Sequence, residues 1–321
     1  MGETLLEIRN LKKYFRTGAG MLHAVDDLSF KIPKGKTIGV VGESGCGKST
    51  LGRTILRLHE ATSGEIWFQG QDILKADKRR MKEIRPKMQM IFQDPYSSLN
   101  GRMTVRQLIA EPLIVNKICR SRREIDEKVD EIMETVGLSQ RLSMSYPHEL
   151  DGGRRQRIGV ARALVLDPEF VVCDEPVSAL DVSIQAQILN LLMDLQEQRD
   201  LTYLFITHDL SVVKHISDEI MVMYLGQCVE MGPSQAVFDS PAHPYTEALL
   251  AAIPIPSIES KHKRRTLLQG EVSTPINPGK GCRFAPRCPR ATEVCRVQEM
   301  KLREVGDHHY SAALCQNREY S

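Results

Sequence analysis

A glycine-rich stretch between an apolar run and a helix-like segment constrains the fold of this chain more than any other feature. The stretch reads GESGCGKS at residues 42–49 and fits the pattern Gly-x4-Gly-Lys-Ser/Thr. Residues 37–41 before it are apolar, and residues 50–58 after it have the composition of a helix. We therefore predict a strand, a phosphate-binding loop and a helix in that order, which indicates an α/β nucleotide-binding fold.

The residue types of this loop suit phosphate binding. Its backbone N–H groups would hold the α- and β-phosphates, Lys48 would reach the β/γ oxygens, and the Ser49 hydroxyl would bind Mg²⁺. The alternative is a glycine-rich turn with a solvated lysine, which the flanking strand and helix disfavour. The nucleotide contacts expected here are Gly42, Ser44, Gly45, Cys46, Gly47, Lys48, Ser49 and Thr50.

A second glycine pair is also suited to an anion. Gly152 and Gly153 lack a Cβ, so their N–H groups can approach a phosphate, and a helix that we expect to begin near Arg155 would add its positive dipole end. Two phosphate-directed loops in one chain suggest a dimer in which the second loop of each chain completes the site of its partner.

Two further apolar runs end in polar side chains. Residues 170–173 predict a buried parallel strand that ends in Asp174 and Glu175, where such strands present ligand sites. Asp174 would hold the Mg²⁺ shell, and Glu175 would face an attacking water. Residues 203–207 predict another strand, which would bring His208 to the same edge for a γ-phosphate contact.

These ordered motifs resemble the ATP-binding subunits of ABC transporters over nearly the whole chain. The resemblance implies a P-loop NTPase cassette of the RecA-like α/β class, with an antiparallel β subdomain and a helical subdomain. In the family pattern the adenine stacks on an aromatic side chain, here Tyr14 with Phe15 as the alternative. Gln93 matches the Q-loop glutamine that senses Mg²⁺ and the lytic water, Asp181 lies in the D-loop that crosses the dimer interface, and His208 matches the switch histidine.

One departure from the family pattern concerns the second loop. The family signature reads Leu-Ser-Gly-Gly-Gln, whereas here Asp151 replaces the serine and Arg154 the glutamine. An ionised aspartate cannot donate a hydrogen bond to a γ-phosphate. At an effective dielectric of about 20, charges roughly 4 Å apart repel by about 4 kcal/mol unless Arg154 or Arg155 offsets this. We therefore expect altered catalysis and an asymmetric heterodimer with a second ATPase subunit; the alternative is that Asp151 only caps the helix.

The C-terminal part narrows the resemblance to dipeptide and oligopeptide importers, through HPYTEALL at 243–250 and GCRFAPRCP at 281–289. We expect a nucleotide-binding domain at 1–255, with a helical subdomain at about 94–157, and a small Cys-rich extension at 256–321.

Half of the eight cysteines lie in this extension, at Cys282, Cys288, Cys295 and Cys315. In a reducing cytosol such clustering favours a metal site over disulfides. The spacing is not the C-x2-C of a zinc ribbon, and the family resemblance implies a [4Fe-4S] cluster. Zn²⁺ is the alternative, because it also accepts sets of four thiolates.

Secondary structure elsewhere follows from local patterns. Residues 5–15 and 28–32 predict strands, residues 64–70 predict part of a hairpin, and residues 121–136 predict a charged helix. Residues 220–231 predict a closing hairpin.

Composition is ordinary for a globular protein, with 41% hydrophobic and 26% charged residues. The formal net charge of +2 gives no indication of general nucleic-acid binding. No apolar run approaches the roughly 18 residues of a membrane span, and the first residues lack a secretory signal pattern. We expect a protein that lies peripherally on the cytoplasmic face of the cell membrane.

The resulting hypothesis is an ATPase that powers the import of dipeptides or oligopeptides. Its expected partners are a second ATPase subunit, two membrane permease subunits and an extracytoplasmic substrate-binding protein. One alternative is an importer of nickel or another chelated metal, since those importers share the tail. The other is a soluble ABC protein that acts on ribosomes or DNA, but such proteins commonly carry two cassettes or a long coiled coil.

Overall fold

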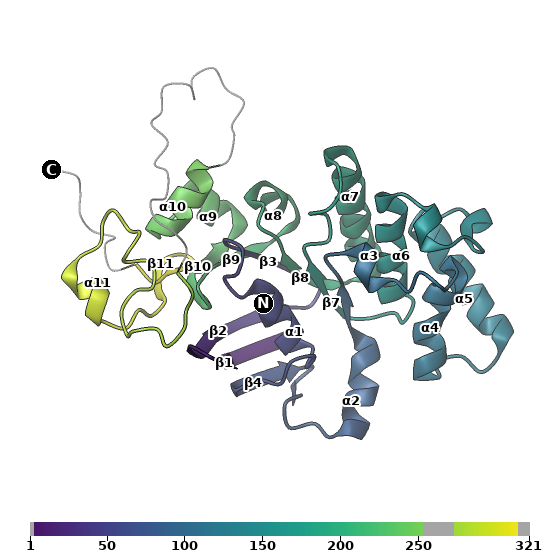
Figure 1. Ribbon diagram of the computed structural model, residues 1–321, viewed down its shortest axis with the longest axis horizontal. Helices are drawn as coiled ribbons and strands as arrows, with labels where there is room; N and C mark the ends of the chain where they lie inside the picture. The colour runs from purple at the N-terminus through teal and green to yellow at the C-terminus, as the bar shows by residue number, and fades with distance from the viewer. Residues whose placement is uncertain (1–2, 253–272, 314–321) are drawn as a thin grey trace, which may run out of the picture. The chain divides into compact units, whose positions relative to one another are not determined.

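The computed structural model describes residues 3–252 and 273–313 (Figure 1). The chain separates into two compact units. The first unit comprises Met1–Leu6, Ile32–Lys36 and Phe68–Ile206, and the second comprises Glu7–Lys31, Thr37–Trp67 and Thr207–Ser321. The predicted boundary at residue 255 stays a prediction.

The core of the first unit is a parallel sheet. Strand β7 (Phe170–Asp174) pairs with β6 (Met88–Ile91) on one side and with β8 (Thr202–Ile206) on the other. Every residue of β7 and β8 is buried, which explains why most residues of both strands are apolar. Both strand predictions are confirmed.

Helices form most of the rest of the first unit, and α4, α5 and α6 lie together in Figure 1. Helix α5 (Arg122–Thr135) lies between Ser121, whose hydroxyl caps its first turn, and Val136, so the predicted charged helix is confirmed. Helix α6 (Gly152–Leu164) packs against α4 (Val105–Asn116). The remaining helices are α2 (Lys78–Ile84), α3 (Pro95–Ser98) and α7 (Val182–Arg199).

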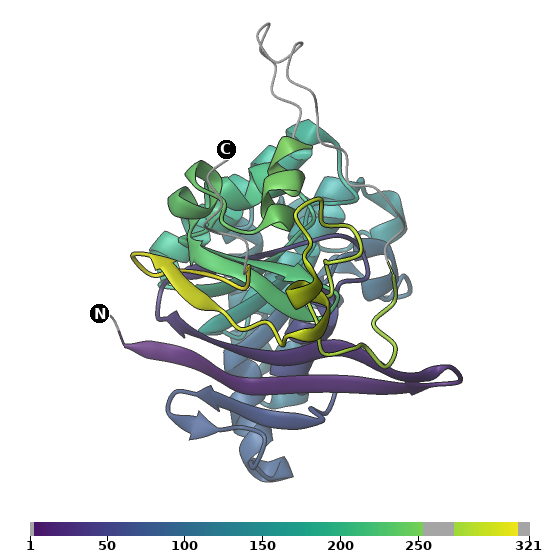
Figure 2. The ribbon, with the colours of Figure 1, turned by 90° about the vertical axis from the view of Figure 1, so that its left-hand side faces the viewer.

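The main sheet of the second unit has the order β11, β12, β10, β9, β3. Strand β3 (Thr37–Val41) runs parallel to β9 (Glu219–Tyr224), and β10 (Gln227–Pro233) returns antiparallel to β9, which confirms the predicted hairpin. Strands β12 (His309–Ser311) and β11 (Arg303–Gly306) extend this sheet and were not predicted (Figure 2).

Two long strands form the other sheet of this unit. Strand β1 (Thr4–Thr17) lies between β2 (Gly20–Pro33) and β4 (Ser63–Phe68), and Figure 2 shows β1 and β2 side by side. In the first unit, Gln69 and Gly70, both with positive φ, precede the short β5 (Gln71–Asp72). Helices of the second unit are α1 (Lys48–Ile55), α8 (Leu210–Ile216), α9 (Ser234–Asp239), α10 (Pro244–Ala251) and α11 (Glu293–Val297).

A buried carboxylate fixes the C-terminal strands to this sheet. Glu230 on β10 has no solvent exposure and accepts hydrogen bonds from the backbone N–H groups of Ala242 and His243. Its other contact is His309 Nε2 on β12, at 2.7 Å. Because a buried charge without partners is costly, this set of contacts favours one position for β12.

Among the residues described, no helix combines the length and the apolar character that a membrane crossing needs.

Candidate active site

The glycine-rich loop of the second unit has a backbone that only glycine fits at two positions. Gly42 has φ 150°, and a Cβ there would lie 2.1 Å from the carbonyl oxygen of Met223. Gly47 has φ 105°, and its Cβ would lie 1.9 Å from the carbonyl oxygen of Ala24. The loop therefore runs in close contact with neighbouring backbone and leads directly into α1.

Lys48 is the first residue of α1 and its side chain returns across the loop. The residue is 5% exposed, and Nζ donates to the carbonyl oxygens of Gly42 at 2.7 Å and Glu43 at 3.1 Å. Ser49 and Thr50 follow in the first turn of α1, while Ser44 and Gly45 are exposed at the loop tip. The arrangement places one cation and a helix N-terminus beside an accessible loop, which suits a polyphosphate.

Cys46 is a structural member of the loop. It is 2% exposed, and burial raises the pKa of its thiol. The Sγ atom would lie 2.9 Å from a Cβ on Gly42, so the thiol packs against the loop.

The aromatic candidates for base stacking lie on β1. The Tyr14 ring stacks on His23 with centroids 3.8 Å apart, and its hydroxyl donates to Asp26. Phe15 meets His59 edge-on at 5.7 Å, and the Lys13 ammonium lies 4.6 Å from its ring centroid. The assignment of Tyr14 to the base stays a prediction, and Phe15 stays its alternative.

The carboxylate pair lies at the carboxyl end of β7 in the first unit. Asp174 is fully buried, as the last residue of the strand. Glu175 has φ 46°, and its N–H donates to the carbonyl oxygen of Ile206 at 2.9 Å. Gln93 Nε2 donates to Glu175 Oε2 at 2.9 Å, so the structure brings together two residues that the sequence only placed in separate motifs.

His208 belongs to the second unit, in the turn before α8. It is exposed, and its neighbours Thr207 and Asp209 organise the turn: the Thr207 hydroxyl accepts from the N–H of Asp209, and the Asp209 carboxylate caps α8 at Ser211.

The second glycine pair differs from expectation in where its helix begins. Helix α6 begins at Gly152, not near Arg155, because Asp151 is the N-cap and accepts from the N–H of Arg154 at 2.8 Å. Arg154 Nε also lies 3.4 Å from the Asp151 carboxylate. Of the two arginines that could offset the charge of Asp151, Arg154 is therefore the one that contacts its carboxylate.

Arg155 has another role. It is 8% exposed, donates from Nε to the carbonyl oxygen of Pro147 at 2.6 Å, and stacks on the Tyr96 ring at 3.9 Å. Its guanidinium fixes the start of α6 against α3.

The signature glycines pack on the D-loop, a contact that the sequence did not predict. A Cβ on Gly152 would lie 3.1 Å from Leu180, and one on Gly153 would lie 2.7 Å from Ile184. Asp181 caps α7 by accepting from the N–H of Ile184 at 3.0 Å. The two loops that the resemblance predicts at a dimer interface thus lie close to each other in the first unit.

Three of the four candidate metal ligands lie together in the second unit. Cys282, Cys288 and Cys295 line one cavity of about 10 Å³ that is also lined by Ala313. Cys315 lies outside the described residues. Within the described ranges, no three His, Cys, Asp or Glu side chains form a group that could hold a metal ion.

Two family models match the chain. One is described as "ABC transporter" and matches residues 25–178; the other is described as "Oligopeptide/dipeptide transporter, C-terminal region" and matches residues 229–295. The second match covers most of β10, all of α10 and the first three tail cysteines.

Curated relatives are similar over nearly their full length. The oligopeptide transport ATP-binding protein OppF of Bacillus subtilis is 56% identical over 302 residues, which cover 94% of this chain and 99% of that protein. AppF of the same organism, also an oligopeptide transport ATP-binding protein, is 50% identical over 97% of each chain. The dipeptide transport ATP-binding protein DppF of Escherichia coli is 48% identical, over 95% of this chain and 92% of its own.

Solved structures share the cassette. The ATP-binding cassette MJ0796, in a dimeric post-hydrolysis state with ADP and Pi, has a TM-score of 0.66 and 27% identity, over 71% of this chain and 98% of its own. The cbiO1 protein of Clostridium perfringens, part of the transporter complex cbiONQ, has a TM-score of 0.66 and 26% identity, over 74% of this chain and 92% of its own.

Proposed function

Since the chain belongs to the family of ATP-binding subunits of oligopeptide and dipeptide ABC transporters, we propose that it hydrolyses ATP to drive the import of these peptides. The observation that carries the proposal is identity of 56% and 50% to peptide-transport ATPases that extends through the tail. Family membership makes the chain an ATPase that uses ATP and Mg²⁺. The named functions of the relatives favour peptides over nickel complexes as the cargo, and transport over action on ribosomes or DNA.

We propose the following residue roles, which the family resemblance implies and the geometry of each loop supports. The loop N–H groups would bind the α- and β-phosphates, and Lys48 would reach the β/γ oxygens. Ser49 in the first turn of α1 and Asp174 at the end of β7 are the proposed Mg²⁺ ligands, and the ion would neutralise phosphate charge. Glu175 orients and polarises the attacking water, and Gln93 positions the Glu175 carboxylate through their hydrogen bond. His208 contacts the γ-phosphate, and Tyr14 stacks on the adenine.

We further propose that the chain works as a heterodimer with a second ATPase subunit, docked on two permease subunits at the cytoplasmic face of the membrane, with an extracytoplasmic binding protein in the full complex. Asp151 supports the asymmetry. Its side chain pairs with Arg154 at 3.4 Å, so the arginine charge offsets part of its repulsion of a phosphate. An aspartate still cannot donate the hydrogen bond that the serine of the family signature donates to the γ-phosphate.

This asymmetry predicts a poor ATPase when the chain acts alone, because a homodimer would place Asp151 at both sites. Adding the cognate ATPase subunit should restore activity. The double variant Asp151→Ser with Arg154→Gln should raise the ATP turnover of the lone chain about 10- to 100-fold. This factor corresponds to the free energy of one charge-assisted hydrogen bond. The measurement is phosphate release per chain with and without the partner.

Asp151→Asn is the comparison variant, since asparagine keeps the helix cap, removes the charge and carries an amide donor in place of the serine hydroxyl. A gain with serine but not with asparagine would identify the hydroxyl donor as the cause. If the lone wild-type chain already hydrolyses ATP as fast as the heterodimer, Asp151 is only a helix cap.

We also propose a [4Fe-4S] cluster on Cys282, Cys288, Cys295 and Cys315. The first three line one cavity, and Ala313 on its wall lies two positions before Cys315. Thiolate-only ligation suits such a cluster and also suits Zn²⁺. The cluster would stabilise the C-terminal extension, which is too short to form its own hydrophobic core.

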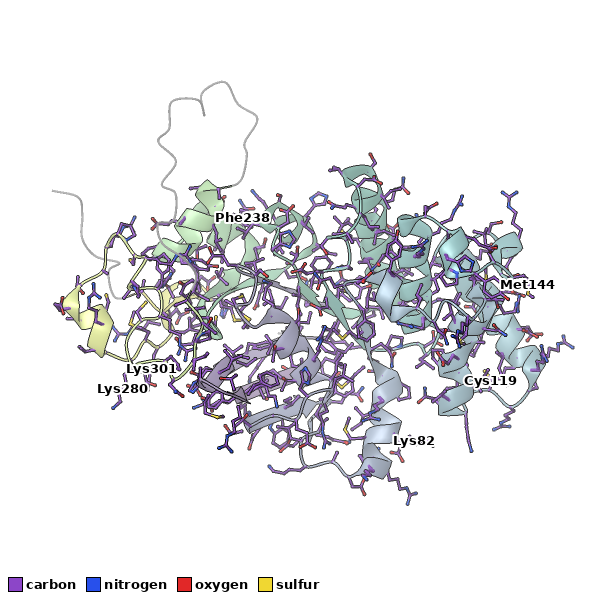
Figure 3. The ribbon with its side chains drawn as sticks, in the orientation of Figure 1. Lys82, Cys119, Met144, Phe238, Lys280 and Lys301 are labelled. Atoms are coloured by element: carbon purple, nitrogen blue, oxygen red, sulfur yellow. The ribbon has the colours of Figure 1, made fainter. Side chains whose placement is uncertain are left out.

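This proposal predicts that anaerobically purified protein is brown and contains about four irons per chain. Cys288→Ser should be colourless and should melt at a lower temperature. Cys119→Ser is the control, because Cys119 is a partly exposed thiol of the first unit and should leave the colour unchanged (Figure 3). Elemental analysis that finds zinc and no iron under anaerobic handling would eliminate the cluster.

A further inference from the structure

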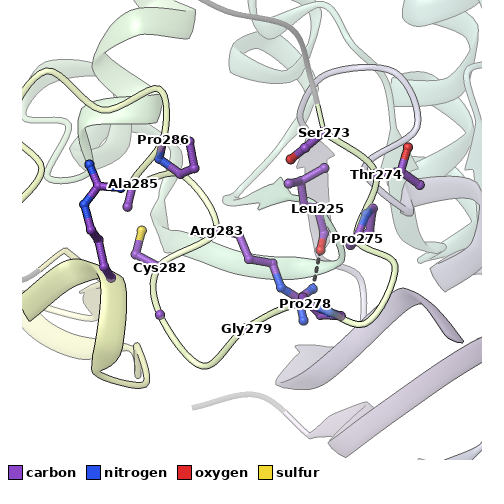
Figure 4. A pocket seen from close by; sticks show the side chains of 12 residues that line it. Leu225, Ser273, Thr274, Pro275, Pro278, Gly279, Cys282, Arg283, Ala285 and Pro286 are labelled. Carbon is purple, nitrogen blue, oxygen red and sulfur yellow. Dashed lines mark hydrogen bonds between the residues drawn. The ribbon is translucent and has the colours of Figure 1, made fainter. Parts of the chain in front are cut away.

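A short segment of the tail, which we call the strap (residues 282–288), carries two arginines that contact the candidate nucleotide site. The side chains of Arg283 and Arg287 are each 7% exposed. Cys282 and Cys288 are the two ends of the strap. Figure 4 shows Cys282, Ala285 and Pro286 at the wall of a cavity of about 290 Å³, with Arg283 extended toward Leu225.

Arg287 holds the phosphate-binding loop. Its Nη1 donates to Glu43 Oε2 at 2.6 Å and its Nη2 to Glu43 Oε1 at 3.0 Å, a bidentate pair. Glu43 is also held through its backbone, because its N–H donates to the Tyr245 hydroxyl at 2.8 Å and its carbonyl accepts from Lys48 at 3.1 Å. The Glu43 carbonyl also accepts from the N–H of Cys46 at 3.3 Å. Each polar group of Glu43 therefore has a defined partner, and two of the four partners, Tyr245 and Arg287, lie in the C-terminal part of the chain.

Arg283 holds Asp26 on β2, whose carboxylate accepts from the candidate base-stacking residue Tyr14. It donates to the carbonyl oxygen of Leu225, drawn as a dashed line in Figure 4, and to the carboxylate of Asp26. The same carboxylate accepts from Tyr14 and lies 3.1 Å from His23 Nδ1. Although burial acts in the opposite direction, hydrogen bonds from Tyr14 and His23 and the charge of Arg283 lower the pKa of Asp26.

Aromatic packing fixes the strap between these two contacts. Phe284 is 1% exposed, and its ring lies 5.3 Å from Tyr224 and 5.4 Å from Tyr245 between centroids. Burial raises the pKa of Tyr245, which keeps its hydroxyl protonated as a hydrogen-bonding group. Since the ring sits in a packed core, neither arginine can shift without moving this cluster.

We propose that the strap is a positioning element for nucleotide binding, in which Arg287 sets the conformation of the phosphate-binding loop through Glu43. The proposal rests on the assigned ATP-binding function. Arg287 does not touch the nucleotide in this assignment; it acts through Glu43. Its loss should weaken nucleotide binding and raise the KM for ATP, while kcat at saturating ATP changes little, because the groups that polarise the water lie elsewhere.

The test compares Arg287→Gln with Arg290→Gln in the full-length chain. Arg290 makes an equally bidentate pair, with Glu247 at 2.8 and 2.6 Å, but that pair does not involve the loop. Calorimetry with ADP and Mg²⁺ should give a dissociation constant about 10- to 100-fold weaker for Arg287→Gln. Arg290→Gln should match the parent, and Arg287→Lys should recover part of the loss.

The double variant Glu43→Gln with Arg287→Gln provides a second measurement, because the two amides can pair with each other. Affinity closer to the parent than that of either single variant supports the proposal. Equal losses of melting temperature in Arg287→Gln and Arg290→Gln, with parental ADP affinity in both, would overturn it. A parent chain that binds neither ADP nor ATP would instead refute the ATP-binding function itself.

Discussion

Replacement of Glu175 by glutamine should lower ATP turnover about 10²- to 10⁴-fold and leave ATP binding intact. This range is the usual contribution of a positioned general base. Glutamine has nearly the same shape, so the local structure at the end of β7 should survive. An amide oxygen cannot accept the proton of the attacking water as a carboxylate does, so ATP stays bound in a closed complex.

The local geometry makes Glu175 the residue to change. Its left-handed backbone, with φ 46°, is uncommon for a residue other than glycine, and the hydrogen bond between its N–H and Ile206 holds it there. Gln93 fixes one carboxylate oxygen at 2.9 Å. The side chain is therefore oriented before any substrate is bound.

Glu169→Gln is the matched control. Glu169 lies at the opposite end of the same strand and pairs with Lys87 at 3.0 Å. Phosphate release from Glu169→Gln should match that of the parent, whereas Glu175→Gln should release almost no phosphate. In the presence of ATP, Glu175→Gln should also elute as a stable closed complex with the second ATPase subunit. Parental turnover by Glu175→Gln would show that the base is another group.

Local features of this fold follow from the sequence. The strands β3, β7 and β8 are buried on every residue, so most of their residues are apolar and each shows a short apolar run in the sequence. The phosphate-binding loop is equally local, since its shape depends on Gly42 and Gly47 and on the helix that follows. Such motifs need no information about distant residues.

Contacts between distant residues could not be predicted in this way. Arg287 and Glu43 are separated by 244 positions, and hydropathy periodicity carries no information on which charges pair. Strands β11 and β12 are short, and every residue of β11 is exposed, so neither shows a strand pattern. The prediction that α6 begins near Arg155 is wrong because it places Gly152 and Gly153 in the preceding loop. In the structure Asp151 is the N-cap, so both glycines lie in the first turn of the helix.

Lys48→Ala should weaken nucleotide binding about 10²-fold. Lys48 Nζ is buried in the loop and donates to two carbonyl oxygens, at 2.7 and 3.1 Å, so the ammonium is held where phosphate oxygens would arrive. Removing it eliminates a charge-assisted contact, worth about 1.5–3 kcal/mol for each hydrogen bond to a charged group. Calorimetry with ATP and Mg²⁺ measures the loss.

The same substitution leaves the Gly42 and Glu43 carbonyls without their lysine donor, so a change in stability must be separated from a change in binding. Lys31→Ala is the control, because Lys31 forms an exposed pair with Glu7 on the same unit and should change neither quantity. The melting temperature of each variant is measured without nucleotide. If Lys48→Ala lowers the melting temperature but keeps the parental ATP affinity, Lys48 only stabilises the conformation of the loop, as Arg287 does through Glu43. The phosphate contact would then have to come from another cation.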